Sequence, residues 1–319
     1  MYLSTRHGTW LLFRLHNNGL PSDLYGIRRV GLLVPKLILE WSVKRLINSR
    51  LDNTIYPLKP KHRLLSGKSY TVNDEVQYQI VNGNVVIKPN VKRFTKTGAE
   101  FEDGSFEEID RVILGTGYEI TVPVDSSLVD VGKKSINLYR NVFPPDLKHP
   151  TLAVIGLTSQ AGPANPICEM QCRWATRLIK GICKLPTQVE MKRHINEYNL
   201  DLDRKSSGST RHPMFVDYIP YLDGIADEIG VKPRLGKLLL QDPSLAFKCF
   251  FGAMLPFQYR LMGPGKWDGA KEAIETSWDR VIGAYRTRRV PEDDYSRLSV
   301  ILMISVAVIA AVVMYCCFQ

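Results

Sequence analysis

The chain has 319 residues, 45% of them hydrophobic, which is enough for one large domain or two modest ones around a buried core. Its formal net charge is +10, and its six cysteines are scattered, with no CxxC pair and no Cys/His cluster at zinc-ligand spacing. These features exclude a disordered chain and a zinc module, and free thiols favour a reducing compartment.

The positive charge is concentrated at the amino terminus. Residues 1–63 hold eleven Lys and Arg against Asp23, Glu40 and Asp52, and eleven minus three leaves +8. A solvated basic face and an anionic membrane surface both explain this charge. We expect no nucleic-acid partner, because no RNP, zinc-finger or helix-turn-helix signature is present. The first residues lack a signal-peptide pattern, so secretion is not expected.

Within this basic region, PKLILEWSVKRLINSRL predicts a helix that begins at Pro35, since proline is favoured at the first helical position. Leu37, Ile38 and Trp41 lie on one face of that helix. The face packs against the rest of the protein or lies in a membrane interface, and the sequence leaves both alternatives open.

From residue 70 to 114 the pattern changes to short apolar alternations broken by turn dipeptides. Asn82-Gly83 and Asp103-Gly104 supply the positive φ angles that tight hairpins need, so we expect a small β-meander. Its last strand is expected at Arg111–Leu114.

The next segment, TLAVIGL at 151–157, is a continuous apolar run, typical of a strand buried on both faces of a parallel sheet. We expect helices after it at 166–180, 187–199, 215–229, 235–240 and 267–286. A strand, a glycine turn and a helix in succession indicate an α/β fold.

Two glycine-bearing segments are candidate ligand sites. In LGTGY, Thr116 and Gly117 follow an expected strand, where the absence of a β-carbon lets a flat cofactor approach, although a structural turn explains the motif equally well. The second segment contains Gly156, Leu157 and Gly162 and leads into a helix whose first N–H groups suit an anionic group, such as the edge of a reduced flavin. An ordinary βα loop is the alternative.

The last residues, LSVILMISVAVIAAVVMYCCF at 298–318, contain no charge over 21 positions, about 31 Å of helix. This predicts a single carboxyl-terminal transmembrane anchor, with the bulk of the protein facing the cytoplasm because arginines flank its upstream end. So short a tail favours the endoplasmic reticulum membrane.

Several stretches together resemble the flavin-containing monooxygenases. They are YLSTRHGTW, FEDGSFEEIDRVILGTGY, NVFPPDLKHPTLAVIGL, EMQCRWA and FFGAMLPFQYRLMGPGKWDGAKEAIETSWDR, in the family's order over nearly the whole chain. The resemblance implies an incomplete flavoprotein fold with two dinucleotide-binding (Rossmann-like) domains. It also implies FAD and NADP as cofactors, with Thr116 and Gly117 where the chain returns to the FAD domain, and Gly156, Leu157 and Gly162 in the flavin site.

The resemblance also implies a division of the chain. An insertion of the nicotinamide domain that is similar to a membrane-associated region is followed by the returning strands of that domain, the carboxyl-terminal half of the FAD domain, a helical extension and the anchor. These parts are expected at 1–75, 76–118, 119–240, 241–297 and 298–318.

The chain departs from the family by lacking the GxGxxG turns for FAD and NADP, so we expect it to begin well inside the enzyme and to bind cofactor weakly alone. The family's activity is NADPH- and O2-dependent oxygenation of soft nucleophilic nitrogen or sulfur centres through an FAD C4a-hydroperoxide. We identify no catalytic side chain and no metal site. The alternative is a catalytically inactive, membrane-anchored interaction protein; a homo-oligomer remains open.

Overall fold

The computed structural model describes residues 1–53, 55–60, 63–64, 70–118, 120–132, 135–206 and 214–288. The chain divides into two compact units, Met1–Ile274 and Glu275–Gln319. The expected anchor at 298–318 lies outside the described residues. Within the described ranges, no helix is both long enough and apolar enough to cross a membrane.

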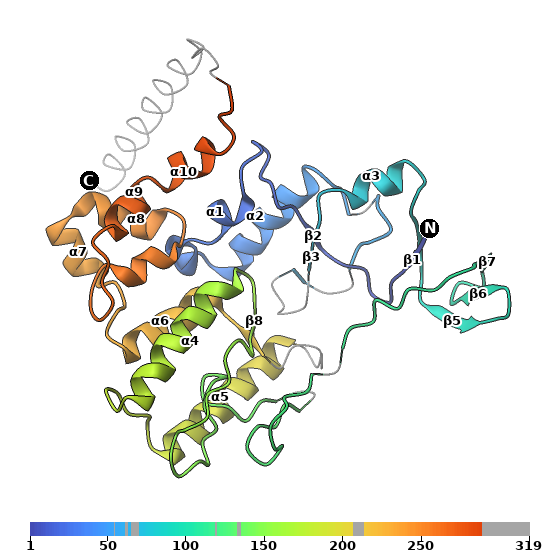
Figure 1. Ribbon diagram of the computed structural model, residues 1–319. Helices are drawn as coiled ribbons and strands as arrows, with labels where there is room; N and C mark the ends of the chain where they lie inside the picture. The colour runs from blue at the N-terminus through green and yellow to red at the C-terminus, as the bar shows by residue number, and fades with distance from the viewer. Residues whose placement is uncertain are drawn as a thin grey trace, which may run out of the picture. The chain divides into compact units, whose positions relative to one another are not determined.

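Most of the regular secondary structure in the first unit is helical (Figure 1). Five confirm predicted helices, with ends that differ by a few residues: α2 (Lys36–Asn48), α4 (Ala164–Ile179), α5 (Gln188–Ser206), α6 (Tyr218–Glu228) and α7 (Leu235–Gln241). The prediction of one helix over 267–286 was wrong, because the segment forms α9 (Ala270–Glu275) and, in the second unit, α10 (Ser277–Gly283). The helices that were not predicted are α1 (Ser22–Gly26), α3 (Val76–Val81) and the 3-10 helix η1 (Arg29–Leu33). The helix α8 (Pro243–Phe251) and the 3-10 helix η2 (Pro256–Arg260) lie in the segment expected as a helical extension, but their bounds were not predicted.

The strands are short and form small sheets. Three parallel pairs join β1 (Tyr2–Ser4) to β4 (Val86–Lys88), β2 (Leu11–Leu12) to β3 (Thr71–Val72), and β8 (Ser159–Gln160) to β9 (Phe215–Val216). An antiparallel sheet has the order β5 (Val91–Phe94), β6 (Gly98–Phe101), β7 (Phe106–Glu108). The fold is therefore mixed α/β, and in the described residues no sheet exceeds three strands.

One of the two predicted hairpin turns is confirmed. Gly104, with φ +82°, lies in the turn between β6 and β7. The hairpin at Asn82-Gly83 was wrong, because the preceding residues form α3. The Asn73 side chain accepts hydrogen bonds from the N–H groups of Glu75 and Val76, both at 2.7 Å, and so stabilises the entry to that helix.

The two apolar segments predicted as strands, Arg111–Leu114 and 151–157, form no strand. In the first, Ile113 is 92% exposed and Leu114 is 72% exposed. A strand needs a neighbour that accepts its backbone hydrogen bonds, and none of the described residues pairs with these segments in a sheet. Their apolar composition therefore did not suffice to make them strands.

The largest hydrophobic core lies among α4, α5 and α6. Trp174 of α4 is fully buried, and its ring meets those of Phe143 and Tyr139 edge-on, at centroid distances of 4.8 and 5.8 Å. Burial of such large aromatic side chains contributes strongly to stability. This core holds the carboxyl-terminal half of the first unit together.

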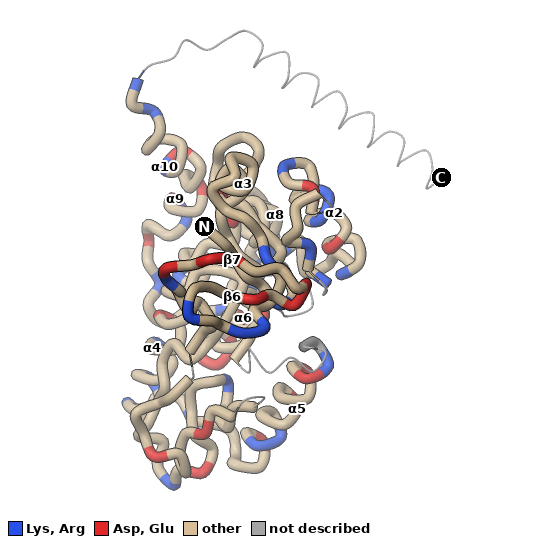
Figure 2. Tube along the Cα trace, turned by 90° about the vertical axis from the view of Figure 1, so that its right-hand side faces the viewer, with Lys and Arg blue, Asp and Glu red and all other residues tan. Residues whose placement is uncertain are grey.

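Helix α2 packs through the face opposite to the predicted apolar one. Ile47 is buried against Trp10 and Leu64, whereas Leu37, Ile38 and Trp41 are 69%, 56% and 61% exposed. Figure 2 shows Lys and Arg gathered along the same helix. The apolar face of α2 therefore does not pack against the described part of the protein, and the alternative of a membrane interface stays a prediction.

On the packed side of α2, the buried carboxylate of Glu40 binds two cations, Arg63 at 2.5 Å and Lys44 at 2.9 Å. It also accepts the N–H of Leu64 at 3.3 Å. The hydrogen bond from Arg63, opposed by burial and reinforced by Lys44, lowers the pKa of Glu40 from 4.5 to about 2.

Candidate functional site

The turn from Gly156 to Pro163, which precedes α4, is the better formed of the two predicted sites. Gly156 has φ +82°, a conformation that favours glycine, and its N–H donates to Oε1 of Gln171 at 2.7 Å. A β-carbon on Gly162 would lie 2.8 Å from the ring of Tyr218. Both glycines are therefore required by the local backbone and packing.

A short chain of hydrogen bonds fixes this turn to the core. The amide Nε2 of Gln171 donates to the hydroxyl of Tyr221 at 2.7 Å, and that hydroxyl donates to the carbonyl of Arg140 at 2.7 Å. Gln171 is fully buried, and burial raises the pKa of Tyr221, so this hydroxyl stays protonated. Because each buried polar group has a partner, the chain of bonds holds the turn in one conformation.

Two further elements bracket the turn. Ser159 and Gln160 form β8, which pairs with β9 immediately before α6, and the N–H of Ser159 donates to the carbonyl of Met214 at 2.8 Å. Leu157 is partly buried and packs against a cluster that includes Ile136 and Leu138. Leu157 thus anchors the turn by packing.

The first turn of α4 offers two hydrogen-bond donors, the N–H groups of Ala164 and Asn165, because Pro163 and Pro166 have no N–H. No side chain at Pro163, the residue that precedes the helix, accepts from the first N–H groups, and α4 extends for 16 residues behind them. Unsatisfied N–H groups and the positive end of the helix dipole favour an anionic group at this position. The turn can therefore hold the negatively charged edge of a ligand.

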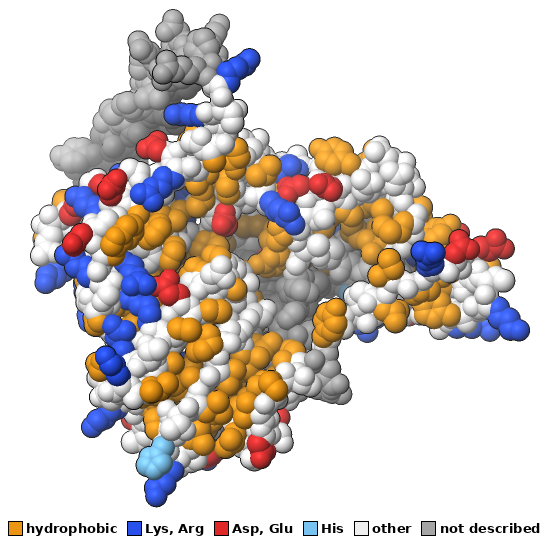
Figure 3. Space-filling model, viewed as in Figure 1, with side chains coloured by type: hydrophobic (Ala, Val, Ile, Leu, Met, Phe, Trp, Pro, Cys, Tyr) orange, Lys and Arg blue, Asp and Glu red, His pale blue; other side chains and the backbone are white. Residues whose placement is uncertain are grey.

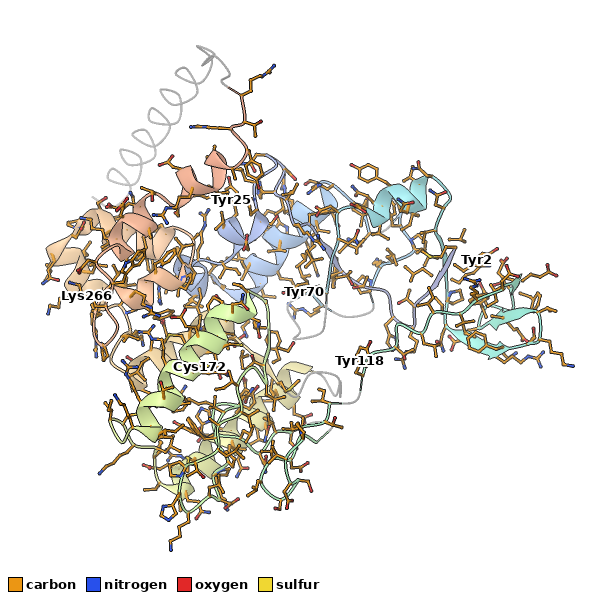
Figure 4. All side chains as sticks on the ribbon, viewed as in Figure 1. Tyr2, Tyr25, Tyr70, Tyr118, Cys172 and Lys266 are labelled. Atoms are coloured by element: carbon orange, nitrogen blue, oxygen red, sulfur yellow. The ribbon has the colours of Figure 1, made fainter. Side chains whose placement is uncertain are left out.

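Thr116 and Gly117 have a different environment. Both lie in an exposed segment outside any helix or strand; Gly117 has φ +93°, a conformation that favours glycine, and a β-carbon on it would meet nothing within 4 Å. Figure 4 labels the neighbouring Tyr118, which is fully exposed, and Cys172, which lies on α4, well apart from it. No hydrogen bond between described residues joins this segment to the Gly156 turn, so the structure does not bring the two predicted sites together.

Helix α4 carries two functional residues that the sequence did not predict, Gln171 at the turn and Arg173 at the loop that contains Pro264. The guanidinium of Arg173 donates to the carbonyls of Tyr259 at 3.3 Å and Pro264 at 3.1 Å. Arg173 thereby fixes the glycine-rich loop that contains GPGKWDGA against α4. Burial, and then the nearby Arg260, lower the pKa of Arg173. Both residues belong to EMQCRWA, one of the stretches that carry the family resemblance, and this stretch was the sequence signal that could have identified them.

The described residues contain no group of three His, Cys, Asp or Glu side chains that could hold a metal ion. Gln171, Tyr221 and Arg173 already pair with the protein, whereas Oε1 of Gln160, within the turn, is buried and has no hydrogen-bond partner. What the turn offers a ligand is therefore backbone N–H groups and close approach.

The comparison with known families decides the assignment of the chain. A family described as FMO-like, flavin-binding monooxygenase-like, matches residues 1–318. The chain belongs to this family. The family binds flavin, as its name states, which agrees with the predicted resemblance and with a turn built for close approach.

Similar proteins include flavin-containing monooxygenase 5 of Mus musculus, 42% identical over 99% of this chain and 60% of the relative. The same enzyme of Homo sapiens is 43% identical over 91% of this chain and 55% of the relative. Flavin-containing monooxygenase 3 of Canis lupus familiaris is 40% identical over 90% and 55%. The chain therefore spans no more than 60% of the length of these relatives.

Among solved structures, S-allyl-L-cysteine S-oxygenase from Allium sativum is similar, with 18% identity and a TM-score of 0.43. The alignment covers 86% of this chain and 61% of that protein. At this level of similarity, the activity of that enzyme does not transfer to this chain.

Proposed function

We propose that this chain is the carboxyl-terminal part of a flavin-containing monooxygenase. The complete enzyme uses NADPH and O2 to oxygenate soft nucleophilic nitrogen or sulfur centres of small molecules, with FAD and NADP as cofactors. The observation that carries the proposal is the family match over residues 1–318, together with relatives about 42% identical over nearly the whole chain.

The residues present fit one side of a flavin site. Gly156 and the open first turn of α4 allow the ring edge of FAD to approach backbone N–H groups, and the nearest atom to a β-carbon on Gly156 would be Sγ of Cys168, at 3.4 Å. The chain has no GxGxxG turn, so it does not hold the pyrophosphate. Thr116 and Gly117 join the site only if the segment they occupy is repositioned.

When bound, FAD supplies the activation of oxygen. The role of this chain is to position the flavin and to exclude water. Gln171 and Tyr221 hold the Gly156 turn in place, and Leu157 fills the apolar cluster behind it. A site in which the cofactor carries the chemistry and the protein positions it needs no catalytic acid or base from this chain.

We also propose association with the endoplasmic reticulum membrane. Besides the exposed apolar face of α2, Leu32 and Leu33 of the preceding η1 are 54% and 73% exposed, and basic residues lie along α2. An apolar face bordered by cations suits a membrane interface. The predicted division into parts at 1–75, 76–118, 119–240, 241–297 and 298–318 belongs to this proposal, with the last part as the anchor.

The test is reconstitution in lipid nanodiscs. The full chain is expressed alone and together with the amino-terminal segment of mouse flavin-containing monooxygenase 5 that this chain does not match. Bound flavin is then measured by visible absorbance, and NADPH oxidation by its loss of absorbance. We expect flavin and NADPH oxidation only in the combined sample, with a large loss in Gln171→Leu. A Gln241→Leu variant, on exposed α7, serves as the control.

The second candidate function is a catalytically inactive, membrane-anchored interaction protein. The specific observation in its favour is the exposed apolar segment with Ile113 and Leu114, since such surface suits a protein partner. Folded, colourless chain in both nanodisc samples, with retained binding of the added segment, would support this function over the enzyme.

A further inference from the structure

A groove of about 610 Å³ lies between the proline-rich segment 144–150 and the connection from α4 to α5. None of the predicted flavin-site residues lines it. Its volume falls within the range of small-molecule pockets, roughly 300 to 1,000 Å³. The groove is therefore large enough for a small organic ligand, and it is separate from the Gly156 turn.

Apolar and polar side chains share the floor of the groove. Its apolar part includes Leu178, at the end of α4, and Met191, in α5, both 6% exposed, and Leu185 and Pro186 also line it. Figure 3 shows hydrophobic side chains interspersed over the face that includes α4 and the segments around it. An apolar body of a few carbon atoms would bury hydrophobic surface on this floor.

The rim of the groove carries uncompensated positive charge. Lys148 and Lys184 are exposed, and neither makes an ion pair with the described residues. The carboxylate that lines the groove, Asp146, is already paired with Lys192 at 2.6 Å, and it accepts a hydrogen bond from the Gln188 amide. The ion pair with Lys192 also lowers the pKa of Asp146, so this pairing persists at neutral pH.

We propose that this groove binds a small amphiphilic carboxylate, with its apolar body on Leu178 and Met191 and its head group between Lys148 and Lys184. Charge complementarity selects the anion, because a cation of the same shape would face two ammonium groups. An alcohol of the same shape would gain only the apolar contact. The proposal does not depend on the flavin chemistry.

Cys183, which lines the groove and is partly buried, provides a direct readout. Its alkylation by iodoacetamide is followed by mass spectrometry in the full chain, held in nanodiscs of zwitterionic lipid. The exposed Cys172 of α4, which does not line the groove, is the internal reference. Three ligands with one apolar body are compared: 4-phenylbutyrate, 4-phenylbutanol and 4-phenylbutylamine.

We expect 4-phenylbutyrate to slow alkylation of Cys183 at least about fivefold at saturation, without slowing that of Cys172. The amine should give no protection. In Lys148→Gln/Lys184→Gln, half-protection should need about tenfold more 4-phenylbutyrate, the loss expected for charge-assisted contacts worth about 1.4 kcal/mol. The control, Lys237→Gln/Lys248→Gln, makes the same change in net charge at exposed positions of α7 and α8.

Each other outcome overturns the proposal. Equal protection by all three ligands would show an apolar site that does not select charge, and no protection by 4-phenylbutyrate would show that the groove does not bind this class. Equal weakening in both double variants would assign the effect to the net charge of the protein.

Discussion

Arg29 is expected to be a sensitive position for stability. Its guanidinium is 6% exposed and binds both carboxylate oxygens of Asp223, at 2.7 and 2.8 Å. It also donates to Oε1 of Gln258 at 2.9 Å, and the hydroxyl of Tyr259 donates to Asp223 at 2.6 Å. One side chain near the amino terminus thus joins η1, α6 and η2.

Replacement of Arg29 by Leu leaves the Asp223 carboxylate, 15% exposed, with Tyr259 as its remaining donor in this group. Removing one partner of a buried ion pair costs about 3–5 kcal/mol of unfolding free energy. Because Tyr259 still donates to Asp223, the expected loss is at the lower end, about 3 kcal/mol. Arg29→Lys keeps the charge but not the paired geometry, so it should lose about 1–2 kcal/mol. The double variant Arg29→Leu/Asp223→Leu should recover most of the loss.

The assay is urea unfolding of the full chain, followed by tryptophan fluorescence. Arg193→Leu is the control, because its pair with Glu197 is solvent-exposed on both sides, at 74% and 69%, and should contribute at most about 0.5 kcal/mol. Equal unfolding free energies for Arg29→Leu and Arg193→Leu would refute the reasoning. Failure of the double variant to recover would show that Arg29 acts through its other contacts.

Three further predictions concern separate parts of the first unit. The pKa of Glu40 is about 2 in the folded chain against 4.5, so its stabilisation is present above about pH 4.5 and is lost as the pH falls toward 2. Unfolding free energies at pH 5 and pH 3 should therefore fall about 1–2 kcal/mol further in the wild type than in Glu40→Gln. Gly162→Ala should lose about 1–3 kcal/mol by overpacking, whereas Gly236→Ala, which meets nothing within 4 Å, should be neutral or slightly stabilising, as thermal unfolding can show. Limited trypsin should cut first after Arg111, in an exposed segment, and later after Arg177 in α4, an order that intact mass spectrometry reads directly.

The helices were predictable because their signals are local. Pro35 precedes α2 as its N-cap, and Pro166 lies in the first turn of α4. The antiparallel strands β5, β6 and β7 were likewise within the predicted meander, but the parallel pairs were not predictable from local signals, because β4 pairs with β1, more than 80 residues earlier in the chain. An apolar alternation therefore shows that a segment can form a strand, but its partner decides whether it does.

The contrast between local signals and long-range contacts also explains which residues of the candidate site were predicted. Gly156 and Gly162 were predicted because glycine is itself the signal for an unusual turn. Gln171 and Tyr221 were not, because their roles depend on one hydrogen bond to each other across 50 residues of sequence. Thr116 and Gly117 were predicted from the glycine motif and from the resemblance; Gly117 does have a positive φ of +93°, but the described residues do not bring this segment to the Gly156 turn.

The two apolar segments that form no strand indicate which structural neighbours the proposed enzyme must supply. In Arg111–Leu114, consecutive apolar residues rather than alternate ones are exposed, and consecutive apolar residues are typical of a strand that is buried on both faces of a parallel sheet. The sequence therefore encodes neighbours that the described residues do not supply. In the proposed enzyme those neighbours are parallel strands, and the loops that follow such strands carry the glycine turns that hold pyrophosphates. A segment that supplied those parallel strands would therefore cover Ile113 and would also complete the cofactor site.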